Sequence, residues 1–276
     1  MRDSLEKTGV DEAALQSELL VFHVLSCSRE EFWAQPNKIL TPDQQNYLEE
    51  LTSRRCKREP LAYIFEEREF FNLRIKVNPS VLIPRPETET LVEQALLWLN
   101  TQTKPEKNFI VADVGTGSGC IALSLATQGF PIQMIATDIS LSAIKVAKRN
   151  CQKYDLAQSI YLVQSDLLNP LSCPIDLIVG NLPYLPDDSL LTLEPEIRDY
   201  EPLIALKGGQ NGTDLNLRLL TQARPLLNAP GAIILEIDPE QRETLERAAK
   251  VYFPTSHVSI TKDLLGLDRV LSVKID

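Results

Sequence analysis

The 276-residue sequence has few of the residues from which metal and redox sites are built. It contains two histidines, His23 and His257, and five cysteines with no CxxC pair. The histidines lie far apart and lack metal-ligand spacing, so we expect no metal site and a structural or surface role for each. An odd number of scattered cysteines predicts reduced thiols in a cytoplasmic protein rather than a disulfide framework.

Long apolar runs and an excess of positive charge are also missing. No run approaches the length of a membrane span, and the charged segment 1–7 has no apolar signal-peptide core. The net charge of −10 argues against a protein that follows a phosphate backbone, since that affinity rests on lysine and arginine. We therefore expect no membrane association and no direct nucleic-acid contact. A composition of 43% hydrophobic and 24% charged residues predicts a globular α/β domain with a smaller second domain.

Helix signals dominate residues 1–62. Asp11 precedes an apolar helical stripe and is expected to cap it, while Ser28–Glu31 and Thr41–Gln44 have the form of capping boxes. No group of catalytic residues occurs here. We predict a small helical domain that recognises a partner.

Residues 63–84 favour extended structure and predict a β-hairpin linker. The expected extended runs are Tyr63–Phe65, Glu69–Phe71 and Leu73–Val77. Two prolines, Pro84 and Pro86, then flank Arg85 ahead of a helix that begins near Glu87. The charges of Arg85, Glu87 and Glu89 form either a surface ion pair or part of an ordered site.

Strand and helix patterns alternate through residues 85–276, which predicts βαβ units in a sheet covered by helices on both faces. The predicted strands are 109–114, 133–137, 160–163, 175–180 and 232–237, with two more near 256–260 and 270–274. The predicted helices are 120–128, 141–153, 214–223 and 240–251. The last two strands are expected to add an antiparallel edge, which gives a mixed seven-stranded sheet.

A tetrapeptide, Asn181–Tyr184, follows the apolar strand 175–180. It places a carboxamide, a backbone carbonyl and an aromatic ring at the carboxyl end of a strand, where ligands bind in open α/β sheets. Such a group suits the binding of a planar amide or amidine nitrogen. An ordinary strand-to-loop exit is the alternative, because asparagine and proline are common in turns.

A glycine-rich turn, Asp113–Gly119, joins the first strand of this domain to its first helix. A dinucleotide site is one interpretation, but the spacing is G-x-G-x-G and the carboxylate of Asp113 would repel a pyrophosphate. That carboxylate suits the ammonium of an amino-acid-bearing cofactor. Asp138 and Asp166 end the next two strands, where they can accept hydrogen bonds from ribose hydroxyls and an adenine amino group. The three aspartates with the turn favour S-adenosyl-L-methionine over capping roles.

Asp113–Gly119 and Asn181–Tyr184 resemble the cofactor and catalytic motifs of class I S-adenosylmethionine-dependent methyltransferases, which have a Rossmann-like fold. Four further segments resemble bacterial protein-(glutamine-N5) methyltransferases, and the similarity is greatest to the release factor branch, PrmC/HemK. These segments are Arg68–Phe71, Ile83–Glu89, Tyr200–Leu206 and Lys262–Arg269. The resemblance implies domains at 1–62, 63–84 and 85–276, and transfer of a methyl group to the glutamine of the Gly-Gly-Gln motif in class 1 peptide chain release factors.

The resemblance also implies the site residues. The expected cofactor ligands are Asp113, Gly115, Thr116, Gly117, Gly119, Asp138, Asp166 and Asn181. The oxygen of Asn181 and the carbonyl of Leu182 would accept hydrogen bonds from the two N–H groups of the substrate amide. Pro183 and Tyr184 would lie beside this amide. Arg85 and Glu87 complete the expected substrate contacts.

The chain departs from the family pattern at Leu182, where proline is usual. A backbone carbonyl serves from either residue, so we expect an effect of roughly 0.4–1 kcal/mol on preorganisation. Gly208–Gln210 reproduces the tripeptide that the family modifies, and we interpret it as a turn.

Four other functions stay open from sequence. They are methylation of a ribosomal-protein glutamine, methylation of adenine N6 or guanine N2 in nucleic acid, a catalytically dead scaffold, and an NAD oxidoreductase.

Overall fold

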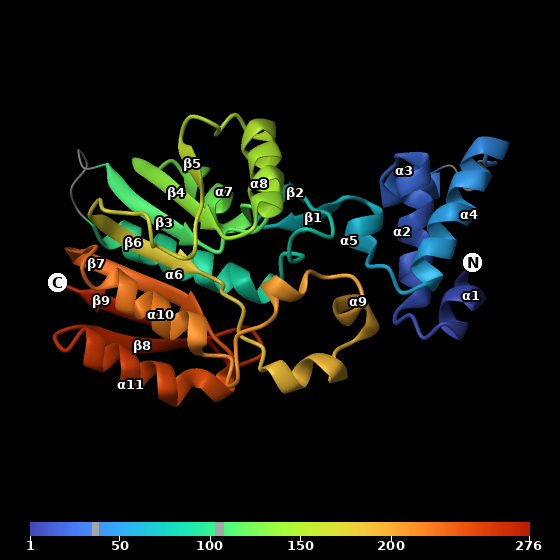
Figure 1. Ribbon diagram of the computed structural model, residues 1–276. Helices are drawn as coiled ribbons and strands as arrows, with labels where there is room; N and C mark the ends of the chain where they lie inside the picture. Colours follow the sequence, from blue (N-terminus) through green and yellow to red (C-terminus); the bar gives the residue numbers. More distant parts are fainter. Residues whose placement is uncertain (35–38, 103–107) are drawn as a thin grey trace. The chain divides into compact units, whose positions relative to one another are not determined.

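The computed structural model describes residues 1–34, 39–102 and 108–276 (Figure 1). The chain divides into two compact units. The first contains residues 1–67 and 194–200, and the second contains residues 68–193 and 201–276. No helix in the described residues is both long enough and apolar enough to span a membrane.

The first unit is helical, as the sequence predicts. Its helices are α1 (Arg2–Lys7), α2 (Ala13–Leu25), α3 (Arg29–Ala34), α4 (Pro42–Cys56) and α5 (Leu61–Ile64). Leu5, Leu20 and Leu51 are fully buried and join α1, α2 and α4 in one apolar core. Both expected capping boxes are confirmed, at Ser28 and at Thr41.

Two local predictions in this unit are wrong. Asp11 does not cap α2, because the chain turns through a left-handed conformation at Glu12, with φ of 48°, and the helix begins one residue later than expected. Tyr63–Phe65 is not extended. Tyr63 and Ile64 lie in α5 with 2% and 3% of their surface exposed, and their burial in the helical unit outweighs their preference for strands.

A distant segment of the chain, residues 194–200, belongs to the first unit through ion pairs with α4 and the residues after it. Glu196 accepts hydrogen bonds from Arg55 at 2.8 Å and from Arg58 at 2.6 Å, and only 5% of the Arg55 side chain is exposed. The two guanidinium groups outweigh the opposing effect of burial and lower the pKa of Glu196.

Replacing Glu196 by alanine is expected to lower the free energy of unfolding by roughly 3 kcal/mol, because it leaves the buried Arg55 guanidinium without its carboxylate. Chemical denaturation measures the change. Glu243→Ala is the matched control, since Glu243 pairs with Arg247 on an exposed helix surface and its loss should not change stability measurably. Equal effects of the two substitutions would contradict this account of the segment.

The second unit contains a seven-stranded mixed sheet in the order β5-β4-β3-β6-β7-β9-β8, which confirms the predicted sheet. The strands are β3 (Phe109–Val114), β4 (Ile132–Asp138), β5 (Ile160–Gln164), β6 (Ile175–Gly180), β7 (Leu227–Glu236), β8 (His257–Lys262) and β9 (Asp268–Ile275). Strands β3 to β7 pair in parallel, and β9 is antiparallel to both of its neighbours. The carboxyl ends of β3, β4, β5 and β6 therefore meet at one edge.

Helices cover both faces of this sheet (Figure 1). They are α6 (Glu89–Thr101), α7 (Cys120–Ala126), α8 (Leu141–Lys153), α10 (Asp214–Ala223) and α11 (Arg242–Tyr252). The short helix α9 (Pro195–Arg198) belongs to the first unit. One apolar cluster joins α10 and α11 to the sheet through fully buried Leu219, Leu245 and Ile233. Strand β7 begins at Leu227 rather than at Ala232, because its first residue already pairs with Ile175 of β6.

The predicted hairpin is confirmed as β1 (Glu67–Phe70) and β2 (Leu73–Lys76). Asn150 of α8 accepts a hydrogen bond from the backbone N–H of Lys76 and donates to the carbonyls of Lys76 and Ser118. Asn150 is fully buried. A single side chain thus ties the hairpin to the glycine-rich turn.

Candidate active site

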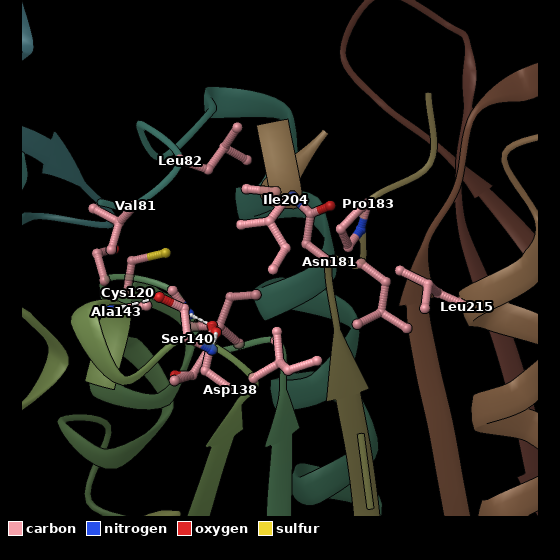
Figure 2. Close-up of a pocket in the computed structure, with 18 of the residues that line it drawn as sticks. Val81, Leu82, Cys120, Asp138, Ser140, Ala143, Asn181, Pro183, Ile204 and Leu215 are labelled. Carbon is pink, nitrogen blue, oxygen red and sulfur yellow. Dashed lines mark hydrogen bonds between the residues drawn. The ribbon is translucent and has the colours of Figure 1, made fainter. Parts of the chain in front are cut away.

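A cavity of about 330 Å³ opens at the edge of the sheet where the parallel strands end (Figure 2). It lies within the second unit. Figure 2 shows Asp138 on one side of the cavity and Asn181 with Pro183 on another. The sequence-predicted site residues that line it are Arg85, Gly115, Thr116, Gly117, Asp138, Asp166, Asn181, Leu182 and Pro183. Asp113, Gly119, Tyr184 and Glu87 are not among the lining residues.

The glycine-rich turn is held against the ends of β3 and β4. The backbone N–H groups of Gly115 and Thr116 both donate to the carbonyl of Thr137 at 2.9 Å. Gly115 has a φ of +73°, and a Cβ there would lie 2.9 Å from the Leu182 side chain. Glycine is needed at this position for its backbone conformation and for the close approach of the turn to the tetrapeptide.

Asp113 lies beneath the turn, where it is fully buried. Its Oδ2 accepts a hydrogen bond from the Thr116 hydroxyl at 2.6 Å and another from the N–H of Ala122 at 3.2 Å. Burial raises the pKa of Asp113 to about 7, although the bond from Thr116 opposes the shift. Its second oxygen has no hydrogen-bond partner among the described residues. A buried carboxyl with an unsatisfied oxygen below the turn fits a cofactor that carries an ammonium group.

Asp138 and Asp166 line the cavity from the ends of β4 and β5, as the sequence predicts. Asp138 accepts hydrogen bonds from the backbone N–H groups of Gly117 and Ser140, and burial raises its pKa. Asp166 pairs with Arg218 at 2.5 Å on an exposed surface. Each carboxylate retains lone pairs for further donors, so both fit a ligand that carries hydroxyl and amino groups.

The tetrapeptide leaves the end of β6 and is fixed at two points. The amide nitrogen of Asn181 donates to the hydroxyl of Thr88 at 3.0 Å. The carbonyl of Tyr184 accepts a hydrogen bond from the Gln241 side chain at 2.7 Å. Because its nitrogen is engaged, Asn181 keeps its amide oxygen as the group available to a ligand.

The side chains of Leu182 and Tyr184, in the same tetrapeptide, lie in surroundings that differ from those expected. Leu182 is 2% exposed and packs in the apolar cluster below the sheet edge, so its side chain is part of the core. Tyr184 does not line the cavity, and burial strongly raises the pKa of its phenol.

Arg85 lines the cavity and pairs with Glu201 at 2.5 Å. The Glu201 side chain is 1% exposed, and burial raises its pKa against the opposing effect of Arg85. The pair therefore anchors Arg85 from a segment 116 residues away. Sequence reasoning placed Glu201 and Thr88 within recognisable segments but assigned neither a contact, because their partners are distant in the chain.

Comparisons with known proteins agree over nearly the whole chain. Residues 1–65 match the family model "PrmC N-terminal domain", and residues 93–191 match "Methyltransferase small domain". The chain is 34% identical to the release factor glutamine methyltransferase of Rhodopirellula baltica, over 99% of this chain and 93% of the relative. It is 35% identical to the human MTRF1L release factor glutamine methyltransferase, over 98% of this chain and 83% of the relative.

Among solved structures, the catalytic domain of hMettl16 in complex with the MAT2A 3′UTR hairpin 6 superposes with a TM-score of 0.59. The alignment covers 78% of this chain and 80% of that structure at 15% identity. This likeness shows the fold of a methyltransferase catalytic domain.

Proposed function

The chain belongs to the release factor glutamine methyltransferase family, and we propose that it methylates the side-chain nitrogen of the glutamine in the Gly-Gly-Gln motif of class 1 peptide chain release factors. S-adenosyl-L-methionine supplies the methyl group as the electrophilic substituent of a sulfonium. The observation that carries the proposal is the orientation of Asn181, whose nitrogen is bound by Thr88 while its oxygen remains available at the cavity.

The glycine-rich turn and three aspartates would hold the cofactor. Asp113 does not line the cavity and holds the turn through Thr116 and Ala122, so its expected contact with the cofactor ammonium stays a prediction. Asp138 fits ribose hydroxyls, and Asp166 fits the adenine side. A dinucleotide suits this site less well, because a buried carboxylate beneath the turn opposes a pyrophosphate.

The substrate amide is a poor nucleophile because its nitrogen lone pair is delocalised into the carbonyl. The Asn181 oxygen and the Leu182 carbonyl accept hydrogen bonds from the two N–H groups of the substrate amide. These hydrogen bonds orient the nitrogen and favour its pyramidal form. Orientation of this kind supplies at most ~7–11 kcal/mol of the barrier. Acceptors aimed at N–H groups whose acidity grows in the transition state add electrostatic stabilisation.

The remaining contacts follow from the two units. Arg85, which pairs with Glu201, and Pro183 surround the substrate side of the site. Tyr184 and Glu87 support that side. The helical unit recognises the release factor.

The five cysteines are free thiols, in keeping with a reducing cytoplasm.

Mass spectrometry tests the function directly. Purified release factor is incubated with the protein and S-adenosylmethionine, and the expected product carries one methyl group on the tripeptide glutamine. A release factor with glutamate in place of that glutamine is the control, because it lacks the amide nitrogen. Methylation of DNA, RNA or a ribosomal protein, with none on the release factor, would refute the proposal.

Replacing Leu182 by proline is expected to keep methyl transfer within about tenfold of the wild type, because the proposed contact uses the backbone carbonyl. The same change removes buried side-chain volume and should lower the free energy of unfolding by ~1–2 kcal/mol. Steady-state kinetics and chemical denaturation measure the two effects. A loss of transfer without a loss of stability would show that the leucine side chain itself serves the reaction.

A further inference from the structure

We propose that Glu236 and Thr88 form a relay that sets the orientation of the Asn181 amide, so that Glu236 is a positioning residue for the methyl transfer. This inference rests on the proposed function. It concerns a buried acid outside the lining of the cavity, at the end of β7.

The sheet register brings the three groups together. Gly180 of β6 pairs with Leu235 of β7. Asn181 comes directly after Gly180 and Glu236 directly after Leu235, so the two residues lie next to each other at the same edge of the sheet. Thr88 ends the 3-10 helix Pro86–Thr88 and bonds to Asn181. Thr88 and Glu236 are 2% and 1% exposed, so bulk solvent does not compete for their hydrogen bonds.

The direction of the hydrogen bonds is determined by chemistry. A hydroxyl has one proton, and an ionised carboxylate only accepts. Asn181 donates its amide nitrogen to the Thr88 hydroxyl at 3.0 Å, so the proton of that hydroxyl is free for another acceptor. Glu236 is the acceptor that we infer, since a hydrogen bond with Thr88 is among the causes that lower its pKa. The Asn181 oxygen is consequently directed away from Thr88, where the reaction needs an acceptor.

Burying an ionised carboxylate at position 236 costs free energy, so the presence of a glutamate there needs an explanation. Burial raises the pKa of Glu236 to about 7, while Thr88, Arg269 and Arg85 lower it and Glu87 raises it. One oxygen of Glu236 has no hydrogen-bond partner among the described residues. Glutamine would fill the same volume without charge, but its NH₂ group can donate to Thr88 and free the hydroxyl proton for Asn181. The ionised carboxylate, which the hydrogen bond with Thr88 favours, can only accept and so enforces the required direction.

Thr88→Val and Glu236→Gln test the relay, because each keeps the shape of the residue. Both should lower kcat by about 10- to 100-fold, since a hydrogen bond involving a charged group is disturbed. KM for the release factor and the Kd for S-adenosylmethionine, measured by calorimetry, should change by less than about threefold. Thr88→Ser, which keeps the hydroxyl, should restore kcat.

A double-mutant cycle separates positioning from general support. In an Asn181→Ala background, Thr88→Val should lower kcat no further, because the residue through which it acts is gone. Ser272→Ala is the control for loss of a buried hydroxyl: Ser272 lies on β9 with no hydrogen-bond partner in the described structure, and its removal should not change kcat.

The outcomes are distinct. Wild-type protein that fails to methylate release factor refutes the proposed function and leaves the relay without a reaction. Wild-type transfer with unchanged kcat in both Thr88→Val and Glu236→Gln overturns the relay alone. Additive losses in the double-mutant cycle also overturn it, as they would assign Thr88 a role independent of Asn181.

Discussion

Replacing Asn181 by alanine is expected to remove nearly all methyl transfer and to change S-adenosylmethionine binding far less, because the other expected cofactor ligands remain. The substitution removes the acceptor for one N–H bond of the substrate amide, while the turn at Gly115–Gly119 and the aspartates beside it stay in place. The loss of one preorganised polar group at a reacting centre costs about 10²–10³ in kcat. Single-turnover kinetics on release factor and calorimetric titration of the cofactor measure the two properties separately.

Asn228→Ala is a matched control for this experiment. Asn228 also donates a side-chain hydrogen bond, at 2.7 Å to Asp176, but it lies near the start of β7 and does not line the cavity. Its replacement should lower stability and leave kcat unchanged. If Asn181→Ala transferred methyl groups at the wild-type rate, the tetrapeptide would not be the acceptor site, and the groups that orient the substrate amide would have to lie elsewhere in the cavity.

The sheet was predictable because its signals are local. A buried parallel strand is a short apolar run, and β3 and β6 have the bounds that their apolar runs predict. The start of β7 was not predictable in this way, since Pro230 and Gly231 interrupt its pattern and only pairing with β6 extends it. The segment around Tyr63 failed for a similar reason, because burial in the helical unit decides its conformation.

The candidate site was predictable only in part. Aspartates that end successive strands are visible in sequence, and Asp138 and Asp166 do line the cavity. The sequence does not show how deeply each aspartate is buried. The place of Asp113 below the turn depends on the helix that follows it, and the bonds of Arg85 to Glu201 and of Asn181 to Thr88 span 116 and 93 residues. Sequence identifies residue types at a sheet edge, whereas their hydrogen-bond partners come from the fold.

Replacing Gly208 by alanine is expected to lower kcat by about 100-fold, although Gly208 does not line the cavity. A Cβ at Gly208 would lie 2.7 Å from the Pro183 carbonyl oxygen and 2.7 Å from the Tyr184 Cα, so the backbone of the tetrapeptide must move. A shift near 1 Å at a reacting centre costs on the order of 10² in rate. Overpacking should also lower the free energy of unfolding by ~1–3 kcal/mol.

The resemblance of Gly208–Gln210 to the substrate tripeptide thus acquires a different explanation. Gly208 is buried and its N–H donates to the carbonyl of Leu185, so this turn closes against the tetrapeptide, while Gln210 is exposed. Gly129→Ala is the control, because a Cβ there meets nothing within 4 Å and only its positive φ opposes the change. It should lower stability without changing kcat. A Gly208→Ala protein with normal kcat would show that the tetrapeptide tolerates displacement, and the two-acceptor geometry would then not limit the reaction.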